Sequence, residues 1–373
     1  MSESKHARKR PGWVPWAALG GALVVGGLAG GFIGAAINSS SASTTASTAT
    51  STPPPSASGL SVCAVPGVAD KVIPSVVTIS AKKGAQGGTG SGEVIRSDGY
   101  ILTNNHVIAL AADGGSIDVQ FSNGTTAPAQ ITGRDPLTDL AVIKVQPSHQ
   151  LKVIQLGSSA SAVVGQPVVV IGAPLGLSET VTSGIISALD RTIQVPGEDN
   201  TTALLVSAIQ SDAAINHGNS GGAMVNCEGQ LLGVPSAGAT VPSSSGESSG
   251  GSIGLGFAIP VDLAKTISDE IIATGSVTHA YFGVSTVPIP PAAAAQAGVP
   301  EGLYVQAVVP GGPSAQAGLQ EGDVITTING KPATSNIQLQ EIAITKSPGD
   351  TVDVGYNRNG KSATTKVTLG TKP

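Results

Sequence analysis

The sequence is poor in aromatic and charged residues, which make up 3% and 12% of its 373 positions. Glycine and proline are abundant instead, with 50 and 25 residues, and both favour turns and loops. The chain is long enough for two or three domains with buried cores. The composition therefore excludes a small disulfide-stapled protein and favours strands of small and β-branched residues joined by many loops.

Positive charge is scarce beyond the first ten positions. The chain carries 19 basic and 24 acidic residues, and four of the basic residues but one acidic residue lie within those ten positions. The remainder therefore has 15 basic residues (19 minus 4) and 23 acidic residues (24 minus 1). A surplus of negative charge opposes contact with phosphates, so we expect no nucleic-acid partner.

A long apolar run follows the basic segment, residues 1–12. Residues 13–37 contain no charged side chain and are numerous enough to cross a bilayer as one helix. We therefore expect a single-pass anchor with its basic end in the cytoplasm and all later residues outside. The run is longer than an ordinary signal-peptide core, and cleavage near Ala35 and Ala36 is the alternative.

Residues 38–62 separate this run from the folded part of the chain. Ser, Thr, Ala and Pro dominate the segment, which is typical of a flexible or glycosylated stalk. Short β-branched runs then follow, and they predict an all-β barrel or sandwich: VIPSVVTIS, SIDVQF, DLAVIKV and QPVVVIGAP. Residues 260–274 have helical spacing with Gly275 as a stop, and we expect the first helix outside the membrane there.

The two cysteines, Cys63 and Cys227, lie outside the membrane in this topology, where oxidation is possible. A disulfide between them would tie the end of the stalk to the barrel, and two free thiols are the alternative. Metal-binding spacings such as Cys-x-x-Cys and His-Glu-x-x-His are absent. We therefore expect neither a metal site nor a cofactor.

The segment that points most clearly to chemistry is Gly218-Asn219-Ser220-Gly221-Gly222. Serine is a weak nucleophile until a base removes its proton. Flanking glycines allow a sharp turn whose N–H groups converge on one point, as an oxyanion pocket requires. Upstream, His106 follows one strand-like run and Asp139 opens another, whereas Asp135 precedes a proline as turn formers do.

Three blocks resemble the signature segments of the HtrA/Deg family of trypsin-like serine proteases: GTGSGEVIRSDGYILTNNHVI, DPLTDLAVIKV and SDAAINHGNSGGAMVN. The resemblance implies a mainly β fold, with a chymotrypsin-like double six-stranded β-barrel over residues 63–276 and the site between the barrels. It also implies that Ser220 attacks the scissile carbonyl, His106 transfers the proton and Asp139 orients the imidazole. The N–H groups of the loop would form the oxyanion hole, which we assign to Gly218, Asn219 and Ser220.

Several positions depart from the patterns of related enzymes. Ala214 stands where tryptic enzymes carry an aspartate, which predicts a specificity pocket for a small or medium apolar side chain. Asn219 replaces the aspartate that pairs with a new N-terminus in pancreatic-type proteases, so that mode of activation is absent. His217 and Ala223 stand in place of prolines, which predicts a looser oxyanion loop. His217 would make the order of this loop depend on pH, or it is an exposed residue without a role. Glu93 replaces an apolar residue for no evident reason.

Residues 279–372 resemble a PDZ domain of the bacterial protease-linked type. Tyr281, Phe282, Gly283 and Val284 match its carboxylate-binding loop, and GGPSAQAGLQEGDVITTINGKPA matches its central block. The resemblance implies that a peptide C-terminus adds as a strand to a sheet edge.

A helix is expected near the C-terminal end of this PDZ-like region, over residues 336–346. Ser335 and Gln338 fit a capping box at its start. Three of its side chains either line the peptide pocket or belong to the core: Leu339, Ile342 and Ala343.

These features predict a serine endopeptidase of the bacterial cell membrane that cleaves unfolded or damaged proteins outside the cytoplasm. Its PDZ domain would bind C-terminal peptides, and the family resemblance implies a homotrimer. Three alternatives stay open at this point: a latent protease, a PDZ-based scaffold or chaperone, and a protease that cuts one signalling partner.

Overall fold

The computed structural model describes residues 63–172, 180–198, 201–238 and 252–372. The predicted basic segment, anchor and stalk, residues 1–62, lie outside these ranges. Within them, no helix has both the length and the apolar character that a membrane crossing requires.

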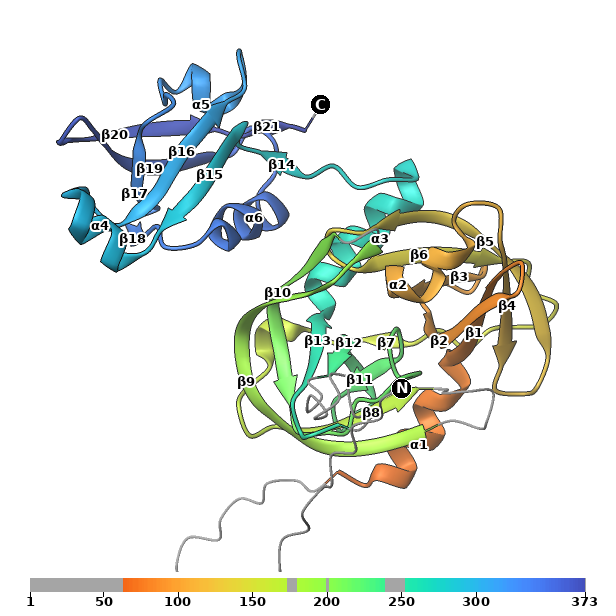
Figure 1. The fold of residues 1–373 in the computed structure, drawn as a ribbon. Coiled ribbons are helices and arrows are strands. Elements are labelled where there is room, and N and C mark those ends of the chain that lie inside the picture. Colours follow the sequence, from red (N-terminus) through yellow and green to blue (C-terminus); the bar gives the residue numbers. More distant parts are fainter. Residues whose placement is uncertain (1–62, 173–179, 199–200, 239–251, 373) are drawn as a thin grey trace, which may run out of the picture. The chain divides into compact units, whose positions relative to one another are not determined.

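Residues 76–145 contain a closed barrel of six strands (Figure 1). They follow the order β1-β2-β3-β6-β5-β4, and every neighbouring pair is antiparallel. Their bounds are β1 Val76–Lys83, β2 Gln86–Val94, β3 Tyr100–Thr103, β4 Ser116–Phe121, β5 Thr126–Asp135 and β6 Leu140–Val145. In β4, Ile117, Val119 and Phe121 are buried and alternate with exposed residues. This alternation buries one face of the strand, and closure of the sheet leaves no free edge.

Seven further strands form a sheet in the order β11-β8-β9-β10-β13-β12-β7. An additional pairing of β11 with β12 closes six of them into a ring, and β7 is added to β12. Their bounds are β7 Gln155–Leu156, β8 Pro167–Gly172, β9 Thr180–Pro196, β10 Thr202–Ser211, β11 Ala223–Val225, β12 Gln230–Gly238 and β13 Gly256–Pro260. The double six-stranded barrel that the resemblance implied is therefore confirmed.

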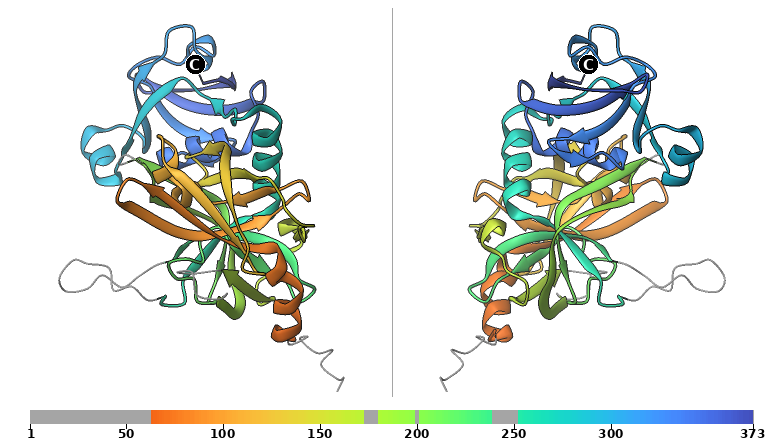
Figure 2. Two further views of the ribbon diagram at one scale, coloured as in Figure 1. Left: turned by 90° about the vertical axis from the view of Figure 1, so that its right-hand side faces the viewer. Right: turned by 90° about the vertical axis from the view of Figure 1, so that its left-hand side faces the viewer.

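One hydrophobic cluster joins the two barrels to helix α3, Val261–Thr274. Leu102 and Val142 of the first barrel pack in this cluster with Leu205 and Val234 of the second barrel and with Ile267 of α3. In Figure 2, the orange strands of the first barrel and the green strands of the second lie side by side. Packed apolar side chains therefore hold the two barrels together.

Short helical segments accompany the barrels: α1 Val65–Val72, η1 Ile73–Ser75, α2 Asn105–Ile108, η2 Ala109–Ala111, η3 Ser159–Ser161 and α3 Val261–Thr274. The helix predicted over 260–274 is confirmed, and its stop, Gly275, has a φ of +84°. The prediction that it is the first helix outside the membrane is wrong, because α1 precedes it. Pro66 suits the first turn of α1, and Val68 and Val72 are buried on one face. The strand expected in VIPSVVTIS therefore begins only at Val76.

A disulfide joins Cys63, just before α1, to Cys227 in the turn between β11 and β12. The cysteines were expected to form either a disulfide or two free thiols, and the structure contains the disulfide. Next to it, Nζ of Lys71 on α1 donates a hydrogen bond to the carbonyl of Glu228. Helix α1 is therefore attached to the second barrel by a disulfide and a hydrogen bond.

The C-terminal region has its own sheet and core. Five strands follow the order β15-β16-β17-β19-β20, β18 pairs with β17, and β14 pairs with β21. The elements are β14 Ala280–Tyr281, β15 Val284–Ile289, α4 Pro291–Ala297, β16 Gly302–Val308, α5 Pro313–Gln316, β17 Val324–Ile328, β18 Lys331–Pro332, α6 Asn336–Thr345, β19 Thr351–Arg358, β20 Lys361–Thr368 and β21 Gly370–Thr371. The capping box predicted at Ser335 and Gln338 is present at the start of α6 and is confirmed.

Candidate active site

His106 and Asp139 lie at adjoining ends of neighbouring strands in the first barrel. The chain leaves β3 at Thr103 and enters α2, which carries His106, while Asp139 directly precedes β6. Because β3 and β6 are antiparallel partners, the end of one lies beside the start of the other. Nδ1 of His106 lies 2.8 Å from Oδ2 and 3.0 Å from Oδ1 of Asp139. One imidazole nitrogen is therefore fixed by the carboxylate.

Asp139 is held in place by contacts from both barrels. Its φ is +58°, in the left-handed region that aspartate adopts more readily than most residues. Its carbonyl accepts hydrogen bonds from the N–H of Asn105 at 3.1 Å and from Nδ2 of Asn104 at 2.8 Å. From the second barrel, Oγ of Ser236 donates to Oδ2 at 2.5 Å. The bonds from Asn104 and Asn105 therefore fix the backbone of Asp139. Its carboxylate is oriented by Ser236 and by the N–H of His106, which donates to Oδ1 at 3.0 Å.

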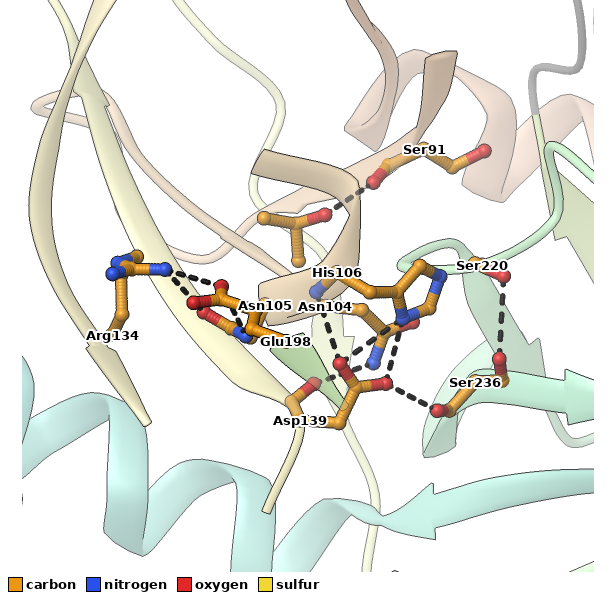
Figure 3. A network of polar contacts seen from close by, with 10 residues as sticks. Ser91, Asn104, Asn105, His106, Arg134, Asp139, Glu198, Ser220 and Ser236 are labelled. Atoms are coloured by element: carbon orange, nitrogen blue, oxygen red, sulfur yellow. Dashed lines mark hydrogen bonds and ion pairs between the residues drawn. The ribbon is translucent and has the colours of Figure 1, made fainter. Parts of the chain in front are cut away.

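Ser220 comes from the second barrel, on the loop before β11. Figure 3 shows the imidazole of His106 between Asp139 and Ser220. The structure thus brings the three predicted residues together across the two barrels. The Ser220 hydroxyl donates to the carbonyl of Ser236 at 3.3 Å, so it must exchange this acceptor for Nε2 of His106 before it can act as a nucleophile.

The turn before Ser220 offers two backbone donors. Gly218 has a φ of +98°, which glycine adopts without steric cost. Within the described ranges, the N–H groups of Gly218 and Ser220 donate to no backbone carbonyl, so an oxyanion could accept from both. Asn219 was expected in the same hole, and this expectation needs correction. Its N–H donates to the carbonyl of Asn216 at 3.0 Å and therefore closes the turn.

The segment before the nucleophile is bonded to this turn through Ala214. The carbonyl of Ala214 accepts from Oγ1 of Thr182 at 3.0 Å and from Nδ2 of Asn219 at 3.3 Å. His217 is exposed, whereas Ala223 is buried at the start of β11. The preference for apolar side chains and the pH effect of His217 stay predictions.

The rival aspartate, Asp135, has partners of its own. Both of its carboxylate oxygens lie 2.9 Å from Nε2 of His279, and the hydroxyl of Thr138 donates to it. The carboxylate beside His106 is that of Asp139.

Three residues next to His106 form a hydrogen-bonded ring that the sequence did not reveal. Nη1 of Arg134 donates to Oε1 of Glu198 and, at 3.1 Å, to Oδ1 of Asn105. Nδ2 of Asn105 donates to Oε1 of Glu198 at 2.8 Å, which closes the ring (Figure 3). Glu198 follows β9 and Arg134 lies on β5, so the ring links the barrels. Ser236 was also missed. The contacts join residues far apart in sequence, and no local motif marks them.

Glu93, on β2, is a charged residue in an apolar environment. Its side chain is fully buried, and both carboxylate oxygens lack a hydrogen-bond partner within the described ranges. Burial raises the pKa of this carboxyl well above its usual range, because the interior disfavours the charged form.

Comparison with known proteins gives consistent matches. A trypsin-like peptidase domain matches residues 90–234, and a PDZ domain matches residues 280–369. Serine protease PepD of Mycobacterium tuberculosis is 44% identical over 321 residues, which cover 84% of this chain and 68% of PepD. The periplasmic pH-dependent serine endoprotease DegQ of Escherichia coli is 39% identical over 288 residues, or 76% of this chain. The chain spans 60% of the length of DegQ.

Solved structures give the same picture. The HtrA-type protease AlgW, solved with a decapeptide, has a TM-score of 0.66 and 32% identity, and the match covers 83% of this chain and 99% of AlgW. A serine endoprotease from Yersinia pestis has a TM-score of 0.61 and 35% identity, with 84% of this chain and 99% of that chain covered. The chain therefore belongs to the HtrA family of trypsin-like serine proteases that carry a PDZ domain.

Proposed function

We propose that the chain is a membrane-anchored serine endopeptidase that cleaves unfolded or damaged proteins outside the cytoplasm. The observation that carries this proposal is the contact of His106 Nδ1 with both oxygens of Asp139, at 2.8 and 3.0 Å. A neutral imidazole bonded in this way keeps its proton on Nδ1 and leaves Nε2 as the base. Ser220 lies on the other side of the ring (Figure 3).

The proposed reaction uses these groups in sequence. Oγ of Ser220 attacks the scissile carbonyl while Nε2 of His106 takes its proton, and the carboxylate of Asp139 stabilises the imidazolium. The N–H groups of Gly218 and Ser220 bind the oxyanion, and one such donor is typically worth about 3 kcal/mol. His106 then gives its proton to the leaving amine, and water hydrolyses the acyl-enzyme by the same steps.

A label specific for activated serine tests this proposal. The full-length chain is treated with a fluorophosphonate, and the adduct is measured by intact mass. We expect one adduct on the parent and on Ser122→Ala, an exposed loop serine, and none on Ser220→Ala. Asp139→Asn should lower casein cleavage by about 10⁴-fold, because it favours the wrong imidazole tautomer. Equal labelling of Ser220→Ala and the parent would contradict the proposal.

A latent form of the same enzyme is the second candidate. It is favoured by the bond from the Ser220 hydroxyl to the carbonyl of Ser236, because a serine held by that acceptor is not activated by His106. If the parent chain takes no label alone but takes it after an unfolded protein is added, the latent form is correct.

We infer that the PDZ domain binds free peptide C-termini. The loop of residues 281–284 leads into β15, which is an end strand of its sheet and so has unpaired backbone groups that a peptide strand can use. Gly283 has a φ of +71°, which favours glycine. The side chain of Phe282 packs in the core of the domain, so its contribution to peptide binding would come from its backbone N–H.

Two side chains of α6, the helix beside this strand, contribute to the core of the domain. Leu339 belongs to the core cluster of the domain, and Ile342 packs against it. Binding to the full-length chain is measured by fluorescence anisotropy with a casein-derived peptide that ends in an apolar residue. We expect its C-terminally amidated form to bind at least about tenfold more weakly, because the loop N–H groups lose a charged acceptor.

The anchor and the homotrimer complete the proposal and rest on the apolar run of residues 13–37 and on the family resemblance. Extraction of membranes with carbonate tests the anchor, and sedimentation of the detergent-solubilised chain tests the trimer. Release of the chain into the supernatant would contradict the anchor, and a monomeric mass would contradict the trimer.

A further inference from the structure

We propose that Ser91 is a positioning residue for the oxyanion hole. This inference rests on the proposed function of Ser220. Ser91 lies on β2 of the first barrel and is fully buried. It contacts the nucleophile loop, which belongs to the second barrel.

Ser91 holds both residues whose N–H groups would form the hole. Its Oγ donates to the carbonyl of Gly218 at 2.6 Å, and its N–H donates to the carbonyl of Ser220 at 2.8 Å. The carbonyl of Ser91 accepts from Oγ1 of Thr103 on β3 at 2.7 Å. The first barrel thus fixes the position of Ser91. Ser91 in turn fixes the positions of the carbonyl groups of Gly218 and Ser220.

The loop packs so closely on Ser91 that it has little room to shift. A Cβ atom placed on Gly221 would lie 2.3 Å from the carbonyl oxygen of Ser91 and 2.4 Å from Oγ1 of Thr103. Such distances are far below van der Waals contact. The glycine therefore permits a direct approach of the loop backbone to β2.

The hydroxyl of Ser91 adds a restraint from the first barrel at Gly218, in a loop whose φ angles no proline fixes. His217 and Ala223 leave the φ angles around the nucleophile less restricted than proline would. The carbonyl of Gly218 belongs to the peptide that links Gly218 to Asn219. If that peptide turned over, the carbonyl would lose its bond to the Ser91 hydroxyl in a buried position, which is unfavourable. The hydrogen bond therefore fixes Gly218 on the side of Asn219 and restricts the rotation that would turn its N–H, on the preceding peptide, away from an oxyanion.

The test compares two deletions of a buried serine hydroxyl. Oγ of Ser75 also donates to a carbonyl, that of Val72, at 2.6 Å, and Ser75 is buried. Ser91→Ala and Ser75→Ala therefore remove equivalent hydrogen bonds from the same domain. Casein cleavage by the full-length chain gives kcat and KM, fluorophosphonate labelling gives the rate of attack by Ser220, and thermal unfolding gives Tm.

We expect Ser91→Ala to lower kcat and the labelling rate together by about 10- to 100-fold, which is less than the loss of an entire oxyanion donor. KM should stay within about twofold, because the hole acts on the transition state. Ser75→Ala should lower Tm by a similar amount and leave both rates unchanged. Equal rates for the two variants would overturn the assignment of Ser91.

A second pair keeps the test decisive if Ser91→Ala does not fold. Ser91→Thr retains the hydroxyl donor. Ser91→Val introduces a side chain of nearly the same shape as threonine but without the hydroxyl. We expect Thr to retain most of the labelling rate and Val to lose it, and equal rates would contradict the proposal. Failure of the proposed function looks different, because the parent chain would then label no faster than Ser220→Ala.

Discussion

A hydrogen bond to Glu198 joins Asn105, the residue that precedes His106, to the second barrel. Nδ2 of Asn105 donates to Oε1 of Glu198 at 2.8 Å, and Arg134 bonds to both side chains. Asn105 is buried, and it begins α2, the helix that carries His106. A movement of the connection between β9 and β10 would therefore be transmitted to the start of this helix.

The first prediction is that Glu198→Ala lowers kcat of casein cleavage by roughly tenfold and leaves KM within about twofold. Loss of the shared acceptor frees Asn105 and lets the His106 imidazole drift from its attacking geometry, and such small displacements reduce rates strongly. Glu198→Gln keeps an acceptor oxygen and should retain most of the activity.

The matched control for Glu198 is Glu228→Ala, which truncates an exposed glutamate in the same domain. Its kcat should equal that of the parent. If Glu198→Ala lowers Tm but leaves kcat per labelled site unchanged, the ring is only structural.

The second prediction concerns Glu93, whose pKa is raised well above 4.5 by burial. An unfolded chain loses this proton near its ordinary pKa, whereas the native chain retains it to a higher pH. Between these two pKa values the native state binds more protons, so its stability falls as the pH rises, by up to about 1.4 kcal/mol per pH unit. Glu93→Leu removes this loss and should be more stable than the parent at neutral pH.

Urea unfolding of the full-length chain from pH 4 to pH 8 measures this difference. The advantage of Glu93→Leu should be smallest at pH 4 and grow as the pH rises above 4.5. Glu228→Leu is the control, because that side chain is exposed. A Glu93→Leu advantage that does not change with pH would show that the native and unfolded carboxyls titrate alike.

The parts of the fold that were predictable depend on patterns within a few residues. The spacing of apolar residues and Gly275 indicate the helix at 260–274. Ser335 and Gln338 indicate the start of α6. The helix α1 was not predicted, because its eight residues contain too few apolar positions to distinguish a helical period from that of a strand. Short apolar runs do not distinguish these two states.

In the candidate site, too, residues within a local motif were predicted, whereas residues defined by distant contacts were not. Ser220 lies in a glycine-rich block, and its predicted role as a nucleophile was inferred from the neighbouring residues. Ser236, Glu198 and Ser91 act through contacts that cross from one barrel to the other. Their partners are set by the packing of the barrels, and a single sequence does not show which residues this packing brings together.

The third prediction is that the disulfide contributes substantially to stability. Replacing both Cys63 and Cys227 by alanine should lower the free energy of unfolding by about 2–5 kcal/mol, because the bridge restricts a long loop of the unfolded chain. For a domain of this size, each kcal/mol corresponds to about 2–4 °C in Tm.

Reduction of the parent chain with dithiothreitol provides the control for this variant. The reduced parent and the double variant should melt at similar temperatures, both below the oxidised parent. If the double variant melts with the oxidised parent, the bridge does not stabilise the native fold.

The last prediction follows from a hydrogen bond at the edge of the PDZ sheet. The carbonyl of Thr286 on β15 accepts from Nδ2 of Asn336 on α6 at 2.9 Å, and Oγ1 of Thr286 donates to Oδ1 of Asn336 at 2.7 Å. A peptide strand that adds to β15 needs carbonyl acceptors of this end strand. Asn336 therefore competes with a bound peptide for the Thr286 carbonyl.

Removal of this competitor should strengthen peptide binding by the full-length chain. We expect Asn336→Ala to lower the Kd of a peptide with a free C-terminus by roughly three- to tenfold, the size of one net hydrogen bond. Gln340→Ala, which truncates an exposed amide on the same helix, should leave the Kd unchanged. Fluorescence anisotropy distinguishes the outcomes. A weaker complex with Asn336→Ala would mean that Asn336 supports the groove, because the loss of its bonds to Thr286 then disorders β15 more than it frees an acceptor.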